Sequence, residues 1–182
     1  PIKSSAASDV YKRQEYEPKV GRENILIYPV GRKVADAVKK MEGLTAAGNY
    51  QHMSGKPNYQ EAADLAAELM TRFASGEIQQ VELLYNHFKS TSSQVLTRET
   101  YLPLDLSAGH ADEKGEEQET MQADYLIEPS PEQVMEELLP KVLRMKMYTV
   151  LLDSTASEHA ARTMAMQIAT DNANDLIQEL TL

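Results

Sequence analysis

The sequence ends on SEHAARTMAMQIATDNANDLIQELTL, residues 157–182, a stretch that contains neither glycine nor proline. Small side chains recur in it every four residues, which aligns them along one face of an α-helix. They are Ser157, Ala161, Ala165, Ala169 and Ala173. A ridge of small side chains lets a second helix approach closely. The high helix propensity of alanine would also explain this composition, but the larger apolar residues Met164, Ile168 and Leu176 favour a helix that packs against a partner.

The same helix is predicted to begin at Ser130. Ser130 is a suitable N-cap, Pro131 favours the first helical position, and Gln133 completes a capping box. Pro140 lacks the backbone donor that its turn needs, so we expect a kink near it. The uninterrupted helix beyond this point should be about 60 Å long. Since a compact chain of this length has a radius of gyration of about 16 Å, the helix is expected to project from the globule.

The residues before this helix alternate between strand and helix patterns. Strands are expected at 24–31, weakly at 49–55, at 78–90 and at 93–104, and helices at 32–41 and 58–76. Pro29 indicates an edge position or a strand end. The alternation predicts a Rossmann-like α/β domain over residues 20–129, with part of its sheet parallel, followed by a long stalk helix over residues 130–182.

Two segments are expected to lie outside the packed structure. PIKSSAASDVYKRQ, residues 1–14, has no periodicity that predicts a packed element. Its end, DVYKRQ, resembles a translated library adapter, so the segment is expected to be non-native sequence or a disordered tail. Residues 105–124 are strongly acidic and are expected to form a solvated loop.

Composition argues against several classes of function. The chain has 182 residues and a net charge of −10, whereas a nucleic-acid-binding protein normally has a basic face. It contains no cysteine, so disulfides and thiolate metal sites are excluded. No apolar run is long enough to cross a bilayer, so we expect any association with a membrane to occur through a partner.

Catalytic and metal-binding patterns are not apparent in the sequence. The four histidines, His52, His87, His110 and His159, are dispersed, and no pair has the spacing of metal ligands. Gly31, Arg32 and Lys33 could receive a phosphate at a helix N-terminus, but the several glycines of a nucleotide-binding fingerprint are missing. No cofactor is predicted. A nucleotide-binding α/β enzyme and an adaptor that binds another helix are alternative hypotheses.

Four segments of the chain resemble, in the same order, the gamma subunit of F-type ATP synthases. They are ENILIYPVGRK (23–33), VELLYNHFKSTSSQ (81–94), DYLIEPSPEQVMEELLP (124–140) and ASEHAARTMAMQIATDNANDLIQELTL (156–182). The resemblance extends over about residues 20–182. It implies that the C-terminal helix forms an antiparallel coiled coil with an N-terminal helix. That helix and the extreme C-terminus of the family have no counterpart here, so the chain is expected to be a fragment.

The resemblance implies a rotor subunit of the central stalk that has no catalytic residues of its own. In that family, proton flow turns a membrane ring, and the rotating shaft drives the beta subunits through ATP synthesis and regulates ATPase activity and proton flow. The implied partners are the alpha and beta subunits of the catalytic ring, the epsilon subunit and the membrane ring of c subunits, without nucleic acid or direct membrane insertion. The implied location is the cytoplasmic side of a bacterial inner membrane, as a peripheral protein.

The resemblance also implies residues that contact these partners. Tyr125 and Glu128 correspond to the base near the membrane ring, although a strand end followed by a helix cap explains them equally well. Shaft residues that could meet the catalytic ring are Glu158, Arg162, Asp171 and Asn172. The first two also have the spacing of an ordinary surface ion pair. The docking face for the absent antiparallel helix is expected to be the ridge of Ser157, Ala161, Ala165, Ala169 and Ala173.

Overall fold

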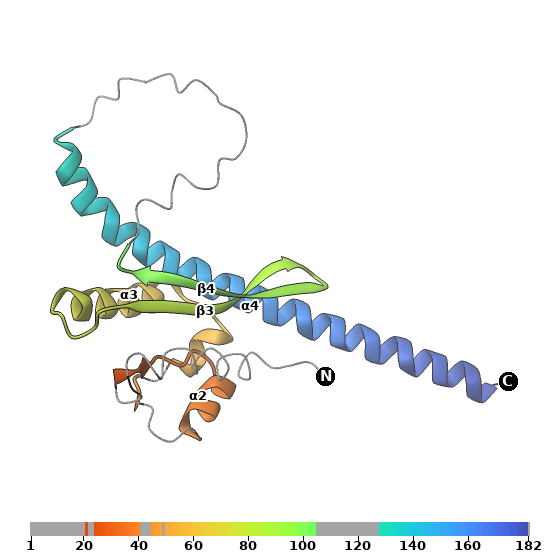
Figure 1. Ribbon diagram of the computed structural model, residues 1–182. Helices are drawn as coiled ribbons and strands as arrows, with labels where there is room; N and C mark the ends of the chain where they lie inside the picture. Colours follow the sequence, from red (N-terminus) through yellow and green to blue (C-terminus); the bar gives the residue numbers. More distant parts are fainter. Residues whose placement is uncertain (1–20, 22–23, 41–44, 49, 105–127, 182) are drawn as a thin grey trace.

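The computed structural model describes residue 21 and residues 24–40, 45–48, 50–104 and 128–181 (Figure 1). The predictions for residues 1–14, for the acidic segment 105–124 and for Tyr125 lie outside the described residues. The elements are β1 (Leu26–Ile27), α2 (Arg32–Lys39), β2 (Thr45–Ala46), the 3-10 helix η2 (Gln51–Ser54), α3 (Tyr59–Ala74), β3 (Val81–Ser90), β4 (Ser93–Leu102) and α4 (Pro131–Thr181). Among the described residues, the strands form two separate two-stranded sheets.

The first sheet is a small parallel unit, and its second strand, Thr45–Ala46, lies outside the strands that the sequence predicted. β1 and β2 pair in parallel, with Leu26 opposite Thr45, and α2 lies in the connection between them. β1 ends before Pro29, as expected for a residue that cannot donate to a sheet. Gly31 has φ 105° at the N-cap of α2, a conformation that side chains other than glycine rarely adopt.

The strand predicted weakly at residues 49–55 is wrong, because residues 51–54 form η2. Met53 in this turn is fully buried. A strand with one buried face would need alternating apolar residues, whereas this segment inserts a single methionine into the core. A short 3-10 turn is sufficient for that.

α3 and the hairpin of β3 and β4 confirm the local signals in the sequence. The side chain of Asn58 accepts a hydrogen bond from the backbone N–H of Gln60 at 3.0 Å, so Asn58 is the N-cap of α3. β3 and β4 pair antiparallel across a polar two-residue turn. Arg98 donates two hydrogen bonds to Glu82 on the opposite strand, at 2.8 and 2.9 Å, and thereby supports the register.

The hydrophobic core lies between α3, the hairpin and the middle of α4. Its buried residues are Met53, Ala62, Leu65, Ala66, Leu69, Tyr101, Leu102, Leu143, Met147 and Leu151. Burial of each large apolar side chain contributes about 1.5–3 kcal/mol. The hydroxyl of Tyr101 donates to the carbonyl oxygen of Leu143 at 2.9 Å, which ties β4 to α4 inside this core.

α4 is a single helix of 51 residues, about 75 Å long. Its predicted cap is present, since the Ser130 hydroxyl accepts a hydrogen bond from the backbone N–H of Gln133 at 3.3 Å. Pro140 lies inside the helix without dividing it, and Figure 1 shows that the first turns run in a different direction from the rest. The last buried residue of α4 is Ala160, and residues 162–181, here called the projecting segment, extend away from the other elements (Figure 1). The predicted class, a small α/β unit with a long C-terminal helix, is confirmed.

Tyr101 makes a testable contribution to stability at alkaline pH. Burial raises the pKa of Tyr101 from 10.0 to about 12, and the charge of Arg144 opposes part of this shift. The folded chain therefore favours the neutral phenol, so the contribution to the free energy of unfolding is complete below pH 10 and is lost as the pH rises from 10 towards 12. A shift of this size corresponds to about 2–3 kcal/mol.

We expect urea unfolding to show that loss between pH 10 and pH 12, and Tyr101→Phe to reduce it. Tyr28, whose burial and hydrogen bond to Glu68 raise its pKa to about 12, titrates in both proteins and provides a common background. The same slope of stability against pH in both proteins would contradict the assignment.

Candidate functional site

The projecting segment of α4 is the candidate functional site. Every residue in it is exposed. Met166, Ile168, Leu176 and Ile177 are each more than half exposed, and Leu180 is 85% exposed. A continuous exposed surface of large apolar side chains is typical of a site that binds a partner.

The apolar side chains of this segment occupy one broad side of the helix. At 3.6 residues per turn, Ala165 and Ala169 lie near the middle of that side, with Ile168 on one flank and Met166 and Ile177 on the other. The opposite side is polar and consists of Thr163, Gln167, Thr170, Asn174 and Gln178. The exposed alanines therefore form a shallow floor between rows of larger side chains, a shape that suits the packing of another helix.

A second exposed apolar row lies earlier on α4, on the face opposite the core. It consists of Met135, Leu138, Val142, Met145 and Leu152. Spacings of three and four residues are typical of the seam of a coiled coil. Met166 lies 14 residues, or two heptads, beyond Leu152, and Ala173, Ile177 and Leu180 follow it in the projecting segment at spacings of seven, four and three.

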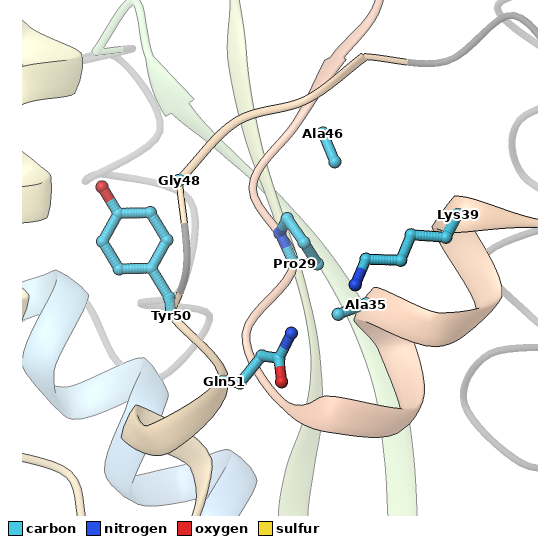
Figure 2. Close-up of a pocket in the computed structure, with 7 residues that line it drawn as sticks. All are labelled: Pro29, Ala35, Lys39, Ala46, Gly48, Tyr50 and Gln51. Carbon is cyan, nitrogen blue, oxygen red and sulfur yellow. The ribbon is translucent and has the colours of Figure 1, made fainter.

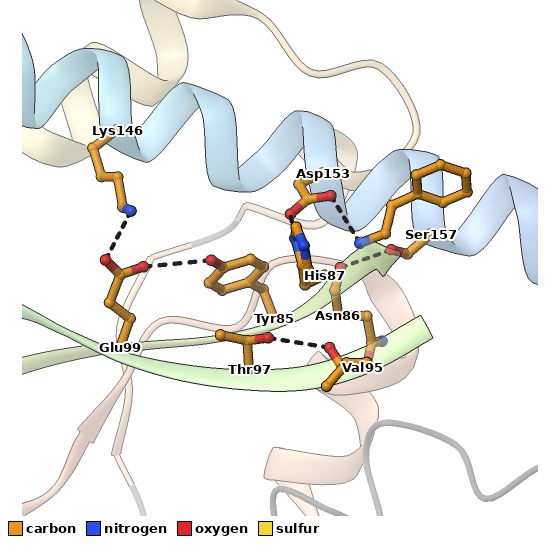
Figure 3. Close-up of polar contacts among 10 residues, drawn as sticks. Tyr85, Asn86, His87, Val95, Thr97, Glu99, Lys146, Asp153 and Ser157 are labelled. Atoms are coloured by element: carbon orange, nitrogen blue, oxygen red, sulfur yellow. Dashed lines mark hydrogen bonds and ion pairs between the residues drawn. The ribbon is translucent and has the colours of Figure 1, made fainter. Parts of the chain in front are cut away.

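Of the ridge predicted from the sequence, only the later part is exposed. Ser157 is 2% exposed, and its hydroxyl donates to the carbonyl oxygen of Asn86 in β3 at 2.8 Å (Figure 3). Ala161 is half-buried, whereas Ala165, Ala169 and Ala173 are exposed. The start of the ridge thus contacts a strand of the same chain, because a small hydroxyl side chain fits closely against a strand backbone as well as against a helix.

The charged shaft residues make contacts within α4. Arg162 donates to Glu158 at 2.6 Å, and both side chains are more than half exposed. The side-chain amide of Gln167 donates to Asp171 at 2.9 Å. Such pairs contribute about 0.2–0.5 kcal/mol. The predicted contacts Glu158, Arg162, Asp171 and Asn172 are all exposed on α4, but the structure does not bring them together into one site.

Glu128 lies at the other end of α4 and is exposed. It borders an open groove that Gln133, Glu136 and Glu137 also line. More than half the length of α4 therefore lies between Glu128 and the other predicted contacts, which begin at Glu158.

A polar cluster that the sequence did not reveal fastens the hairpin to α4 (Figure 3). Asp153 accepts a hydrogen bond from the backbone N–H of Phe88 at 2.9 Å and pairs with His87 at 2.5 Å. Two turns earlier on the helix, Lys146 pairs with Glu99 of β4 at 2.7 Å. One feature of the sequence could have indicated this cluster: Asp153 interrupts the apolar run VLLDS, and a partly buried carboxylate needs a hydrogen-bonding or charged partner.

The described residues contain no group of three or more side chains that could hold a metal ion.

A pocket of about 240 Å³ lies beside α2 (Figure 2), lined by Pro29, Ala35, Lys39, Ala46, Gly48, Tyr50 and Gln51. Ligand sites usually have volumes of about 300–1,000 Å³. Its cation, Lys39, is at the C-terminal end of α2, whereas phosphate binds preferentially at helix N-termini. Arg32 and Lys33, at the predicted phosphate turn, are exposed and do not line this pocket.

Among the described residues, every helix is too short or too polar to cross a bilayer.

The chain is similar in sequence to ATP synthase gamma chains. Residues 2–182 match the family described as ATP synthase. The ATP synthase gamma chain of Phocaeicola vulgatus is 67% identical over 163 residues, which cover 90% of this chain and 55% of the relative. The gamma chain of Bacteroides fragilis is 57% identical over 162 residues, which cover 89% of this chain and 54% of the relative. The chain therefore spans about half the length of the curated relatives it matches.

A solved structure has a similar fold. It is described as the central stalk and c-ring of the mitochondrial ATP synthase of Tetrahymena thermophila. The match has a TM-score of 0.52 and 27% sequence identity, and it covers 79% of this chain and 60% of that chain.

The change from buried to exposed residues along α4 can be tested on the chain by itself by enlarging one alanine at a time. Ala160 is 8% exposed, so Ala160→Leu should overpack its buried surroundings and lower the free energy of unfolding by about 1–3 kcal/mol. Ala169 is exposed, so Ala169→Leu should change the free energy of unfolding by less than about 0.5 kcal/mol. Urea unfolding measures both values, and equal effects at the two positions would contradict the assignment of Ala160 as the last buried residue of α4.

Proposed function

The chain belongs to the gamma-chain family of ATP synthases, and from this we propose that it acts as a rotor subunit in the central stalk of an F-type ATP synthase. Proton flow through a membrane ring turns the subunit, and α4 transmits the rotation to the catalytic beta subunits, which make ATP. The same rotation regulates ATPase activity and proton flow. The observation that carries the proposal is the exposed apolar surface of the projecting segment on an uninterrupted helix.

The geometry of α4 suits a mechanical role. The projecting segment adds about 30 Å of helix beyond the core, and it contains no glycine or proline that would weaken it. Its apolar and polar sides differ, so rotation presents different surfaces to a surrounding ring. Differential contact of this kind is what shifts partners between conformations. We propose that the subunit is non-catalytic and that the chemistry belongs to its partners.

We propose that a further helix packs antiparallel on α4 as a coiled coil. The proposed seam has two apolar stretches, Met135 to Leu152 and Met166 to Leu180, whose residues are spaced by three, four or seven. Ala173 is part of the second stretch and Ala169 lies beside it, where small side chains permit close approach. Because α4 takes part in the core as far as Ala160, we place the boundary between base and shaft near that residue.

The proposed partners follow from the two ends of the molecule. The shaft residues Glu158, Arg162, Asp171 and Asn172, together with the apolar side, would meet the alpha and beta subunits. The opposite end of α4, where Glu128 lies, would meet the epsilon subunit and the membrane ring of c subunits, and the resemblance adds Tyr125 as a candidate contact. The proposed location is peripheral, on the cytoplasmic side of a bacterial inner membrane, through these partners.

The direct test of the function is reconstitution. The complete reading frame that encodes this chain is expressed with the alpha, beta and epsilon subunits and the membrane sector, and ATP-driven proton pumping is measured in vesicles. We expect pumping that is lost when the reading frame is omitted, and no hydrolysis of ATP by this chain alone. Pumping without it would contradict the rotor role. ATP hydrolysis by the isolated chain that disappears in Arg32→Ala or Lys33→Ala would favour the enzyme alternative.

The proposed docking face makes a sharper prediction in the assembled subunit. Ala169→Leu and Ala173→Leu should overpack the contact with the partner helix, at a cost of about 1–3 kcal/mol in the thermal or urea stability of the assembly. Gln178→Leu, on the polar side, is the matched control and should have little effect. If both ridge variants are as harmless as the control, the alanines serve only helix propensity.

A further inference from the structure

We propose that Asp153 is a positioning residue: it fastens α4 to the β3–β4 hairpin and thereby fixes the direction in which the projecting segment leaves the core. The inference concerns the geometry of the chain and does not depend on the rotor function, so the two proposals can fail separately.

Both carboxylate oxygens of Asp153 are engaged by consecutive residues of β3 (Figure 3). Oδ1 accepts from the backbone N–H of Phe88 at 2.9 Å, and Oδ2 pairs with Nδ1 of His87 at 2.5 Å. A carboxylate can only accept, so Nδ1 of His87 carries the proton in this contact. The register of the hairpin is irregular between Phe88 and Ser90, and such irregularities commonly redirect a backbone or side-chain group.

The neighbouring contacts on this face of α4 repeat every three or four residues. They are Lys146, Val150, Asp153, Ser157 and Ala160. Val150 and Ala160 are buried on this face, and apolar burial is non-directional. The hydrogen bonds of Asp153 and Ser157 have strict distance and angle requirements. The polar contacts therefore fix the register between helix and hairpin, while the apolar contacts provide the burial.

Because of the position of Asp153 on α4, a small change in the register at this residue produces a large displacement at the end of the helix. Asp153 lies within two turns of Ala160, the last buried residue of α4. From Asp153 to the end of α4 is about 42 Å of helix, so a tilt of about 10° at Asp153 would move the end of the helix by about 7 Å. A small increase in the range of orientations of α4 at Asp153 therefore produces a large spread in the positions of Leu176 and Leu180.

The competing explanation is that Asp153 only stabilises the fold. The exposure of Asp153 and His87 distinguishes this explanation from a positioning role. The side chain of Asp153 is 21% exposed and that of His87 is 52% exposed. Because the His87 side chain is exposed, water screens its pairing with Asp153 and limits the contribution of the pair to stability. We therefore expect loss of Asp153 to change the direction of the projecting segment more than it changes the unfolding midpoint.

The test uses two spin labels, one on each side of the anchor. The chain has no cysteine, so Ala74→Cys on α3 and Gln178→Cys on the projecting segment can be labelled selectively, and both sites are exposed. Pulsed electron paramagnetic resonance then gives the distribution of distances between them. Asp153→Ala should broaden the distribution at least twofold. Asp153→Asn retains an acceptor for Phe88 and should give an intermediate width.

Glu158→Gln is the matched control, since it removes a carboxylate of α4 whose ion pair lies within the helix. It should leave the distribution unchanged. The proposal is overturned if Asp153→Ala lowers the unfolding midpoint without broadening the distribution, or if Glu158→Gln broadens it equally. Should Asp153→Ala fail to fold, Asp153→Asn decides alone: a broader distribution supports the proposal and an unchanged one overturns it.

Discussion

The buried face of α4 is the constraint on which the rest of the structure depends. Leu143, Met147 and Leu151 pack between α3 and the hairpin, and Tyr101 bonds to the helix backbone inside the same core. Because this helix continues unbroken beyond the core, the packing of its middle turns also determines where its exposed turns lie. The same helix therefore belongs both to the core and to the projecting segment, as the proposed transmission of rotation requires.

The sequence predicted the features that depend on local signals. Asn58 and Ser130 mark helix starts through hydrogen bonds to residues two or three positions away, and the apolar periodicity marks the helices themselves. It did not predict the contact of Ser157 with Asn86 or that of Asp153 with Phe88, since these partners are 71 and 65 residues apart. A small or acidic residue at a helical spacing does not specify whether a strand, a helix or water lies opposite.

The projecting segment is the part of the site that spacing alone did identify. Its alanines repeat every four residues, so their common face followed from helix geometry without tertiary information. Exposed apolar area is unfavourable in water by about 25 cal/mol per Å², and burial of Ile168 and Leu176 against a partner would remove that cost. The proposed assembly would therefore account for the apolar side of the projecting segment, which the described residues of the chain leave exposed.

The most direct test of this account is the accessibility of Ala169 before and after assembly. The chain contains no cysteine, so Ala169→Cys gives a single thiol whose rate of alkylation can be measured, with Ala74→Cys on the base as the reference. The account predicts rapid alkylation of Ala169→Cys in the isolated chain and strong protection in the assembled ATP synthase. Equal alkylation rates in the two states would contradict the claim that the projecting segment is a partner-binding shaft.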